Sequence, residues 1–371
     1  MDMKTVIITD AKYRSAIAAV RSLGKAGYNI VVTQTGKDVS FTPPVFSSCY
    51  VKESVILDCS VNDDIYIDKL YSIIENYDMP VIFPIGAVTL YKLSKNKEKF
   101  LGISHFTVSL PEILDALNDK DCVQRSGIEL NIPTPKRYYS TPDEFPVVIK
   151  PHCGEKLGLI AQNRYLIANN QEEYNRAYIK ISKYDKEPIV QQKIDGDGIG
   201  VCLFIDSYGK LKSAICHKRI REYPITGGPS VCCVSFYDED LITKSYQLLS
   251  NFNFTGIAMV EYKGKYLLEV NPRIWGSFPL TYASGSDFAL KYVEASLGMN
   301  TEYNKNGFTP NTKMVFRLNN FAATFSYIKK LKFIKAFSGI LDNINSKEAL
   351  KDKNDPEPYK KYLKNQLLGK R

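Results

Sequence analysis

The first hundred residues alternate between short apolar runs and segments with apolar side chains at helical spacing. The pattern predicts strands at 4–9, 28–33 and 81–85, and helices at 16–26 and 65–76. Strands that alternate with helices in this way are typical of a parallel sheet covered by its crossover helices. Residues 1–110 are therefore predicted to form a small parallel α/β domain. No Gly-x-Gly-x-x-Gly motif follows the first strand, so a dinucleotide site is not predicted there.

The pattern changes after this domain. Helical periodicity covers 111–127, and extended segments at 146–150 and from Ile189 onward each run into a turn that contains glycine. Another hairpin is predicted around Gly264. The second half of the chain therefore mixes helices with hairpins instead of repeating the strand and helix alternation.

The composition is that of a globular chain. With 371 residues, 44% of them apolar and 24% charged, the chain is long enough for two or three domains with buried cores. The eight cysteines form no Cys-x-x-Cys pair and the chain begins without a secretory leader, so we expect a reduced, cytoplasmic protein. No apolar run approaches the roughly 18 residues needed to cross a bilayer, so an integral membrane segment is not expected.

The basic charge is concentrated in the tail. The net charge is +9, and residues 320–371 contain twelve basic and five acidic residues. Apolar residues at helical spacing lie beside lysines in this tail: Phe333, Phe337, Ile340, Leu341 and Ile344 beside Lys329, Lys330, Lys332 and Lys335. We favour a helix whose apolar face packs against the body, because long charged side chains often flank a buried face. The alternative is peripheral contact with an anionic membrane. Nucleic acid is not expected as a partner.

Two carboxylates and an amide fall in the hairpin around Gly264. Glu269 and Asn271 are two residues apart on a strand and share one face, while Val270 points into the core. Glu261 joins them only if the loop has an odd number of residues. So few oxygen ligands suit Mg²⁺, which keeps waters and takes phosphate oxygens. The hairpin predicts a magnesium site; the alternative is an ordinary polar hairpin edge.

Two strands carry groups that suit a nucleotide. One delivers Lys150 to a turn with Gly154, and a lysine with nearby backbone N–H groups suits phosphate oxygens. The other carries Gln191 and Gln192 into a glycine turn, where backbone groups can hydrogen-bond adenine. Taken singly, each segment is equally a strand that ends in a turn.

A third segment is rich in cations. His217, Arg219 and Arg221 alternate along a strand, so we expect them on one face. The strand leads into a turn with Gly227 and Gly228, whose backbone N–H groups can surround a phosphoryl group. Clustered cations are costly unless an anion shares the space, so this segment favours an anion site over a flexible surface hairpin.

In this order the motifs resemble the ATP-grasp superfamily, specifically its carbamoyl-phosphate-synthase-like carboxylate–amine ligases, across roughly residues 1 to 300. The resemblance implies an α/β fold, α+β in its ATP-grasp part, with a parallel pre-ATP-grasp domain before a two-lobed ATP-grasp fold. The implied parts are the pre-ATP-grasp domain (1–110), a small lobe with the phosphate hairpin (111–195), a large lobe with the Mg/ATP and acceptor site (196–310) and a basic helical extension (311–371).

The resemblance also implies a role for each motif. ATP and Mg²⁺ are the implied cofactors, with Mn²⁺ as an alternative ion. The implied metal ligands are Glu261, Glu269 and Asn271. The implied nucleotide contacts are Lys120, Lys150, Gly154, Lys156, Gln191, Gln192, Lys193, Ile194, Asp197, Gly227 and Gly228. The implied catalytic residues, which oppose the negative charge of phosphoryl transfer, are Arg219, Arg221 and Arg273.

The activity that the resemblance implies is ATP-dependent amide formation. ATP would phosphorylate a carboxylate, and an amine would attack the acyl phosphate and release phosphate, with amino acids or small peptides as the default substrates. Two alternatives stay open: a phosphotransferase or bicarbonate-using carboxylase that acts on a small metabolite, and a nucleotide-binding scaffold without turnover. The expected partners are a small-molecule carboxylate and an amine, and a homodimer is left open.

Overall fold

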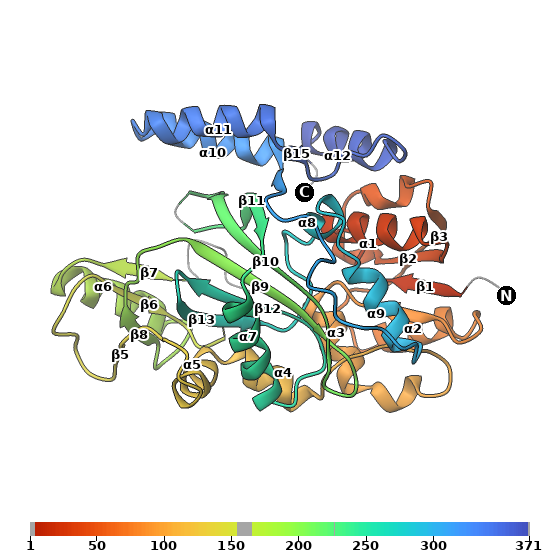
Figure 1. Ribbon diagram of the computed structural model, residues 1–371, viewed down its shortest axis with the longest axis horizontal. Helices are drawn as coiled ribbons and strands as arrows, with labels where there is room; N and C mark the ends of the chain where they lie inside the picture. The colour runs from red at the N-terminus through yellow and green to blue at the C-terminus, as the bar shows by residue number, and fades with distance from the viewer. Residues whose placement is uncertain (1–3, 154–164, 226, 370–371) are drawn as a thin grey trace.

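The N-terminal part of the chain forms a parallel sheet. The computed structural model describes residues 4–153, 165–225 and 227–369. The strand order is β3-β2-β1-β4, all parallel, with helices packed against the sheet (Figure 1). These elements are β1 (Thr5–Ile8), α1 (Arg14–Lys25), β2 (Asn29–Thr35), β3 (Val51–Leu57), α2 (Tyr66–Ile74), β4 (Val81–Phe83) and α3 (Ala87–Lys95), with short 3₁₀ turns at Gly36–Asp38, Pro44–Ser47 and Lys97–Phe100. The predicted parallel α/β fold is confirmed.

An antiparallel sheet follows, in the order β5-β8-β6-β7. Its elements, with the two helices that precede it, are α4 (Pro111–Asn118), α5 (Lys120–Glu129), β5 (Arg137–Tyr138), β6 (Val147–Lys150), β7 (Leu166–Ala168), α6 (Gln171–Ser182) and β8 (Ile189–Gln192). The prediction of one continuous helix over 111–127 is wrong. The chain breaks at Asp119, whose carboxylate accepts hydrogen bonds from the backbone N–H groups of Asp121 and Cys122 at 2.9 and 3.2 Å. This cap starts a new helix at Lys120.

A seven-stranded sheet forms the centre of the molecule, in the order β13-β12-β9-β10-β11-β14-β15. Its strands and helices are β9 (Gly198–Ile205), β10 (Leu211–Glu222), β11 (Ser230–Phe236), α7 (Glu239–Asn251), β12 (Gly256–Lys263), β13 (Tyr266–Asn271), α8 (Pro279–Ala283), α9 (Phe288–Ser296), β14 (Lys313–Val315) and β15 (Lys347–Glu348). Both faces of β9 are buried. Val201 and Leu203 pack with α4 and α7, whereas Cys202 and Phe204 pack with the core of the first domain.

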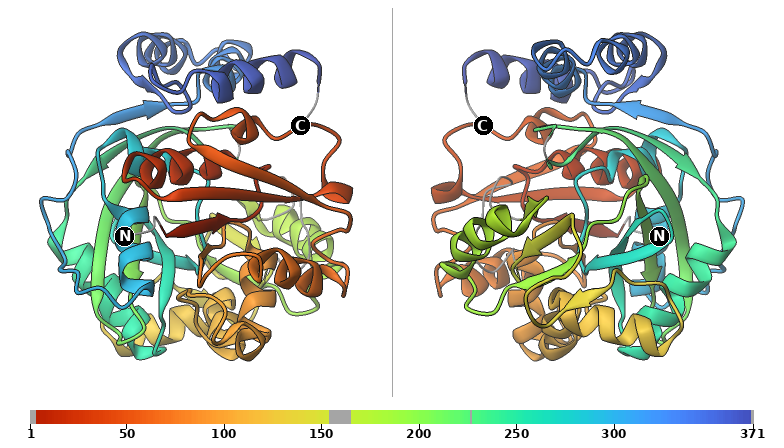
Figure 2. Two further views of the ribbon diagram at one scale, coloured as in Figure 1. Left: turned by 90° about the vertical axis from the view of Figure 1, so that its right-hand side faces the viewer. Right: turned by 90° about the vertical axis from the view of Figure 1, so that its left-hand side faces the viewer.

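The chain ends in three helices: α10 (Arg317–Lys329), α11 (Phe333–Asn345) and α12 (Glu357–Leu367). The α10–α11 hairpin lies at one edge of the molecule, beyond β11, in all views (Figures 1 and 2). β14 and β15 from this tail extend the central sheet, so the tail is joined to that sheet by strand pairing. The division at 110, 195 and 310 remains a prediction. Among the described residues, no helix is long and apolar enough to cross a membrane.

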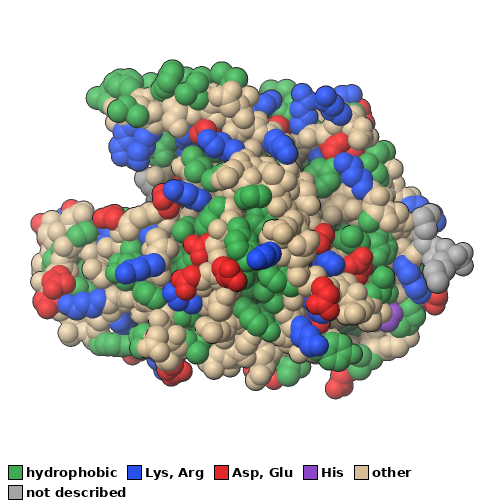
Figure 3. All heavy atoms as spheres, in the orientation of Figure 1, with side chains coloured by type: hydrophobic (Ala, Val, Ile, Leu, Met, Phe, Trp, Pro, Cys, Tyr) green, Lys and Arg blue, Asp and Glu red, His purple; other side chains and the backbone are tan. Residues whose placement is uncertain are grey.

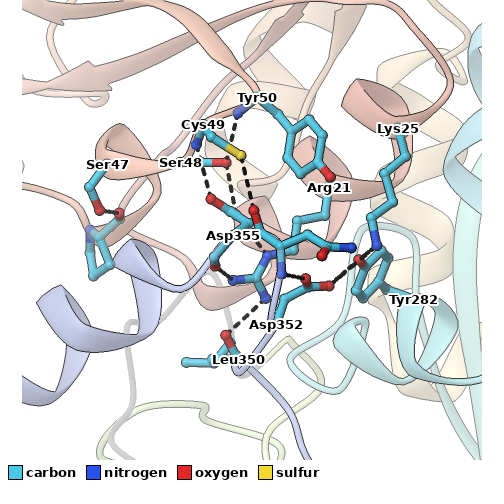
Figure 4. A network of polar contacts seen from close by, with 12 residues as sticks. Arg21, Lys25, Ser47, Ser48, Cys49, Tyr50, Tyr282, Leu350, Asp352 and Asp355 are labelled. Carbon is cyan, nitrogen blue, oxygen red and sulfur yellow. Dashed lines mark hydrogen bonds and ion pairs between the residues drawn. The ribbon is translucent and has the colours of Figure 1, made fainter.

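The tail is also fixed to the first domain. The Arg21 guanidinium donates to the Asp355 carboxylate at 2.9 Å and to the Leu350 carbonyl at 2.8 Å (Figure 4). Asp355 also accepts from the Ser48 hydroxyl and from the Cys49 backbone N–H, each at 2.9 Å. The segment before α12 is therefore held on α1 by a buried ion pair whose lone pairs are taken up by further donors.

The preferred interpretation of the tail, an apolar helix face packed on the body, is wrong. The buried residues of α11 are small or polar: Ala336, Gly339, Asp342 and Asn343. Its large apolar residues, including Phe333, Phe337 and Ile344, are exposed. The periodicity correctly located a helix, but the apolar side faces away from the protein.

Candidate nucleotide and metal site

The two carboxylates of the β12–β13 hairpin lie directly opposite each other. Glu261 pairs with Glu269, and Val260 with the buried Val270. The Asn271 amide nitrogen donates to Glu261 Oε1 at 3.1 Å, so the three predicted metal ligands share one face. This is the face whose apolar residues pack on the first domain, because Met259, the partner of Asn271, belongs to that core.

The predicted reason for this arrangement is wrong. Lys263 pairs with Tyr266, so the turn has two residues, not an odd number. A β-bulge at Leu268 shifts the register between Glu261 and Tyr262. The extra residue shifts the pairing by one position, so Glu261 lies on the same face as Glu269, as it would after a loop with an odd number of residues.

Charges around Glu269 keep it ionised. Lys120 Nζ lies 3.2 Å from Glu269 Oε2. Burial by itself raises the pKa of Glu269, but Lys120 and Lys150 outweigh it and lower the pKa to about 2. For Glu261 the balance is reversed: burial, with a contribution from Glu269, raises its pKa although Arg219 lies 3.3 Å away. Two buried carboxylates that repel each other across a strand pair are a donor set for a hard cation.

Three polar side chains of the four-stranded sheet share a face. Gln191 pairs with Val148 on one side and with Arg137 on the other, and Lys150 is two residues from Val148. Gln191 is buried and accepts a hydrogen bond at 3.1 Å from Gln124 of α5. Gln192 points to the opposite face and is exposed. The two predicted hinge glutamines therefore differ in position, and Gln191 is the one on the face of Lys150.

Lys150 is almost completely buried at the end of β6, with 6% of its surface exposed. Burial lowers the pKa of its amine to about 7; Glu269 opposes this shift, and Lys120 and Arg137 add to it. A buried amine near neutrality gains full charge when an anion joins it.

Arg219 and Arg221 lie on opposite faces of the central sheet, contrary to the prediction. Arg219 pairs with Cys233 but Arg221 pairs with Cys232, because β10 has a bulge at Ile220. Adjacent residues of β11 point to opposite sides, so their partners do too. Arg219 faces the carboxylates with His217. The assignment of Arg221 to the same anion cluster is corrected accordingly.

The two arginines have different partners. Arg219 lies 3.3 Å from Glu261 and 3.6 Å from Glu222. Arg221 donates to Asn320 at 2.6 Å and to Asp342 at 3.0 Å, both in the α10–α11 hairpin. Arg221 therefore fixes the hairpin to the sheet.

Because Arg219 and Arg221 have different partners, we expect their replacement to have different effects. Replacing Arg219 with methionine should lower kcat for ATP turnover by about 10²-fold, the usual loss when one preorganised charge is removed. Replacing Arg221 with methionine should instead lower the free energy of unfolding by about 3 kcal/mol, because Asp342 loses a buried partner, with kcat retained. ADP release and urea unfolding of both variants check this, and an equal loss of kcat in the two would contradict it.

Comparison with solved structures identifies the fold. No family model matches the sequence. The biotin carboxylase domain of Hydrogenobacter thermophilus 2-oxoglutarate carboxylase, a dimer in complex with MgADP, ADP and bicarbonate, matches at 14% identity with a TM-score of 0.63, over 84% of this chain and 74% of that one. Biotin carboxylase from Campylobacter jejuni, in its β-γ-ATP complex, matches at 14% and 0.62 over the same shares. An ADP complex of N5-carboxyaminoimidazole ribonucleotide synthetase matches at 15% and 0.63, over 89% and 85%.

The chain has the ATP-grasp fold. At these identities the likeness concerns the fold alone. Lys120 and Lys150 belong to the part of the chain that forms the four-stranded sheet and Glu269 to the seven-stranded sheet, so the three side chains come together where these two parts meet.

Arg273 lies beside the face that carries Glu261, Glu269 and Asn271. It donates to the Asn271 side-chain oxygen at 3.1 Å and to the Ile274 carbonyl at 3.0 Å. His217 is buried between Cys202, at 3.6 Å, and Ser277, at 3.2 Å. Arg273 is therefore held beside the predicted metal ligands, and His217 fills a packing position.

The remaining predicted residues lie around the hinge and the Gly-Gly turn. Asp197 pairs with Lys218 at 2.6 Å and Lys193 pairs with Asp195. Ile194 is half-buried. Gly154 and Lys156 lie outside the described residues.

The Gly-Gly turn is closed on itself. The Gly227 N–H donates to the Pro224 carbonyl at 3.2 Å, and a Cβ on Gly228 would lie 2.3 Å from the Tyr223 carbonyl carbon. The Gly227 N–H, which was expected to meet a phosphoryl group, is thus already paired.

Sequence reasoning missed Arg137 and Gln124. Nε and Nη1 of Arg137 are buried without a hydrogen bond in the described part of the chain, although Asp121 lies 3.5 Å from Nε. Gln124 donates both to Gln191 and to the Leu268 carbonyl, at 3.1 and 3.2 Å, and so connects the four-stranded and seven-stranded sheets. Neither residue belongs to a motif; the one available signal is that Arg137 opens a strand two residues after Pro135.

Proposed function

We propose that this chain is an ATP-dependent carboxylate–amine ligase that forms an amide through an acyl phosphate and releases ADP and phosphate. The observation that carries the proposal is the meeting of cations and carboxylates between the lobes. Lys120 bridges to Glu269, Arg219 to Glu261, and the buried Lys150 lies close enough to change the pKa of Glu269. Alternating charge of this kind suits a metal ion and a polyphosphate that arrive together.

The residues present fit MgATP. Glu261 and Glu269 offer carboxylate oxygens on one face, which is the donor chemistry that Mg²⁺ prefers. Nε of Arg219 is buried without a hydrogen bond among the described residues, so it can donate to a bound phosphate oxygen. When bound, the metal ion would neutralise phosphate oxygens.

The chain's own residues would act by position and charge. Lys120 and Lys150 would hold the phosphates, and Arg219 and Arg273 would oppose the negative charge that builds during transfer. The substrate carboxylate is the nucleophile in the first step and the amine in the second, so no covalent protein intermediate is required.

Nucleotide binding should take up a proton through Lys150. The pKa of the free amine is about 7, so at about pH 8 it is mainly neutral, and phosphate contact raises its pKa and recharges it. We expect uptake of about one proton per MgADP at that pH, and weaker binding as the pH rises from about 7 to 9.

Calorimetry in two buffers of different ionisation enthalpy measures this uptake. In the Lys150→Arg variant the cation does not titrate, so the enthalpy should not depend on the buffer. A wild-type enthalpy that is equally independent of the buffer would contradict the prediction.

One alternative acceptor is favoured by the solved structures. Bicarbonate is named in the complex of the Hydrogenobacter carboxylase domain, and the third matching protein is named for a carboxyamino product. Carboxylation also proceeds by attack of an amine on an activated carboxyl group, so the same charges would serve it. Bicarbonate is therefore the second acid to test.

The decisive experiment measures ADP and phosphate release from MgATP with pooled amino acids, with and without small carboxylates or bicarbonate, and follows the products by mass spectrometry. Release that requires both an acid and an amine, with a product lighter by one water than their sum, supports the ligase. Release that requires bicarbonate, with a carboxylated amine as product, supports the alternative. Nucleotide binding without release under any of these conditions would overturn both.

A further inference from the structure

The α10–α11 hairpin presents a large apolar surface to the outside. Its outer apolar residues, from 41% to 88% exposed, are Leu318, Phe321, Phe325, Ile328, Leu331, Phe333, Ile334, Phe337, Ile340, Leu341 and Ile344. Figure 3 shows hydrophobic side chains along the outer edge of the hairpin. We call these eleven residues the outer face. Such a contiguous set is uncommon on a protein that meets only water.

The inner side of the hairpin explains why the apolar residues face outward. Small residues line it, and a Cβ on Gly339 would lie 2.2 Å from the Thr324 hydroxyl oxygen, so the two helices pack too closely for large side chains. Asn320 donates to the Gly339 carbonyl at 3.0 Å. A large residue turned inward would have to separate the helices, so the outer face is a built feature of the fold.

Buried polar contacts fix the hairpin in this orientation. Asp342 of α11 accepts from Arg221 at 3.0 Å and from Lys313 at 2.9 Å. Arg221 also donates to Asn320 of α10. Rotating either helix to bury the outer face would break these charge-assisted hydrogen bonds and leave charges unpaired.

The charge of the hairpin is one-sided. Four lysines lie at its tip: Lys329, Lys330, Lys332 and Lys335. Residues 317–345 contain one acidic residue, Asp342, which is buried and already paired twice. A second copy of the chain would therefore meet these lysines with a hairpin that offers no exposed carboxylate, whereas an anionic surface would complement them.

We propose that the outer face docks on an anionic lipid bilayer, with its apolar side chains at the acyl boundary and the lysines of the tip at the headgroups. Large apolar side chains on one face with lysines beside them are what an interfacial helix needs. The hairpin lies at the edge of the molecule beyond β11, so it can lie flat on a membrane while the lobes stay in water (Figures 1 and 2). This proposal does not depend on the activity proposed above.

Vesicle sedimentation of the full chain tests the proposal. We expect the protein to sediment with vesicles of phosphatidylcholine and phosphatidylserine at low salt, much less with phosphatidylcholine alone, and less as salt is added. Changing Lys329, Lys330, Lys332 and Lys335 to glutamine should weaken binding by about a hundred-fold or more, since each lysine near an anionic surface contributes roughly five-fold. Ile334→Asn with Phe337→Asn should also abolish binding, without a cost to folding, because both side chains are exposed.

Two control variants remove the same groups elsewhere in the tail. One changes Lys351, Lys353, Lys360 and Lys361 to glutamine, and the other changes the exposed Leu367 and Leu368 of the chain end to asparagine. Both should bind anionic vesicles as the parent does. Sedimentation velocity without lipid tests the alternative that a second copy of the chain covers the outer face. The proposal would be overturned if the parent does not bind vesicles and instead forms a dimer that the double change Ile334→Asn and Phe337→Asn dissociates. Equal losses of vesicle binding in the control variants would also overturn it.

Discussion

Replacing Glu269 with glutamine is expected to lower kcat for MgATP turnover by about 10³-fold, close to the loss seen when a charge that positions a metal or a transition state is removed. The amide keeps the shape of the side chain but loses its charge. Lys120, 3.2 Å away, and the nearby buried Lys150 would then repel each other without the carboxylate between them. The metal would lose the donor that the surrounding cations keep ionised.

A matched variant separates this effect from the loss of any carboxylate in an ion pair. Glu172→Gln removes the same group from a pair with Arg176 at 2.7 Å on the exposed surface of α6, and it should leave kcat unchanged. Steady-state ADP release measures both, with circular dichroism to show that each variant is folded. Turnover by Glu269→Gln within ten-fold of the parent would remove Glu269 from the metal site.

Replacing Asp355 with alanine is expected to lower the free energy of unfolding by about 3–5 kcal/mol, because it leaves a buried guanidinium unpaired. Asp355 and Arg21 each expose 1% of their side chains, so water cannot take the place of the lost carboxylate. The same change also leaves the Ser48 hydroxyl and the Cys49 N–H without their acceptor (Figure 4). The tail should detach from the first domain at a lower urea concentration.

Fluorescence of Trp275, the one tryptophan, follows this change, because Trp275 shares a core cluster with Tyr362 of α12. Lys360→Gln breaks an exposed pair with Glu357 and should cost less than about 1 kcal/mol. Combining Asp355→Ala with Arg21→Met should cost less than the two single changes added together, since neither charge is then left alone. Strict additivity would show that the pair does not act as a unit.

Some elements could be predicted from the sequence because their buried residues are apolar and mark the element along the chain. β1 and β2 consist almost entirely of buried residues, and α1 is buried without interruption from Ser15 to Arg21, so the apolar positions place all three elements within two residues of their bounds. β3 was not predicted. It is one of the two edge strands of the sheet, and its residues Lys52 to Ser54 are exposed, so its sequence carries no alternation to detect.

The sequence by itself determined the order of the motifs, the alternation that puts Glu269 and Asn271 on one face, and the amphipathic character of the tail. The tertiary structure decided how these parts meet. The bulge at Leu268 brings Glu261 to the face of Glu269 and Asn271, and the bulge at Ile220 turns Arg221 away from that face. A bulge depends on how neighbouring strands pack, which local sequence does not encode. Likewise, an apolar helix stripe has the same periodicity whether it faces a core or a membrane; the tight packing of Gly339 on Thr324 decided which way this one points.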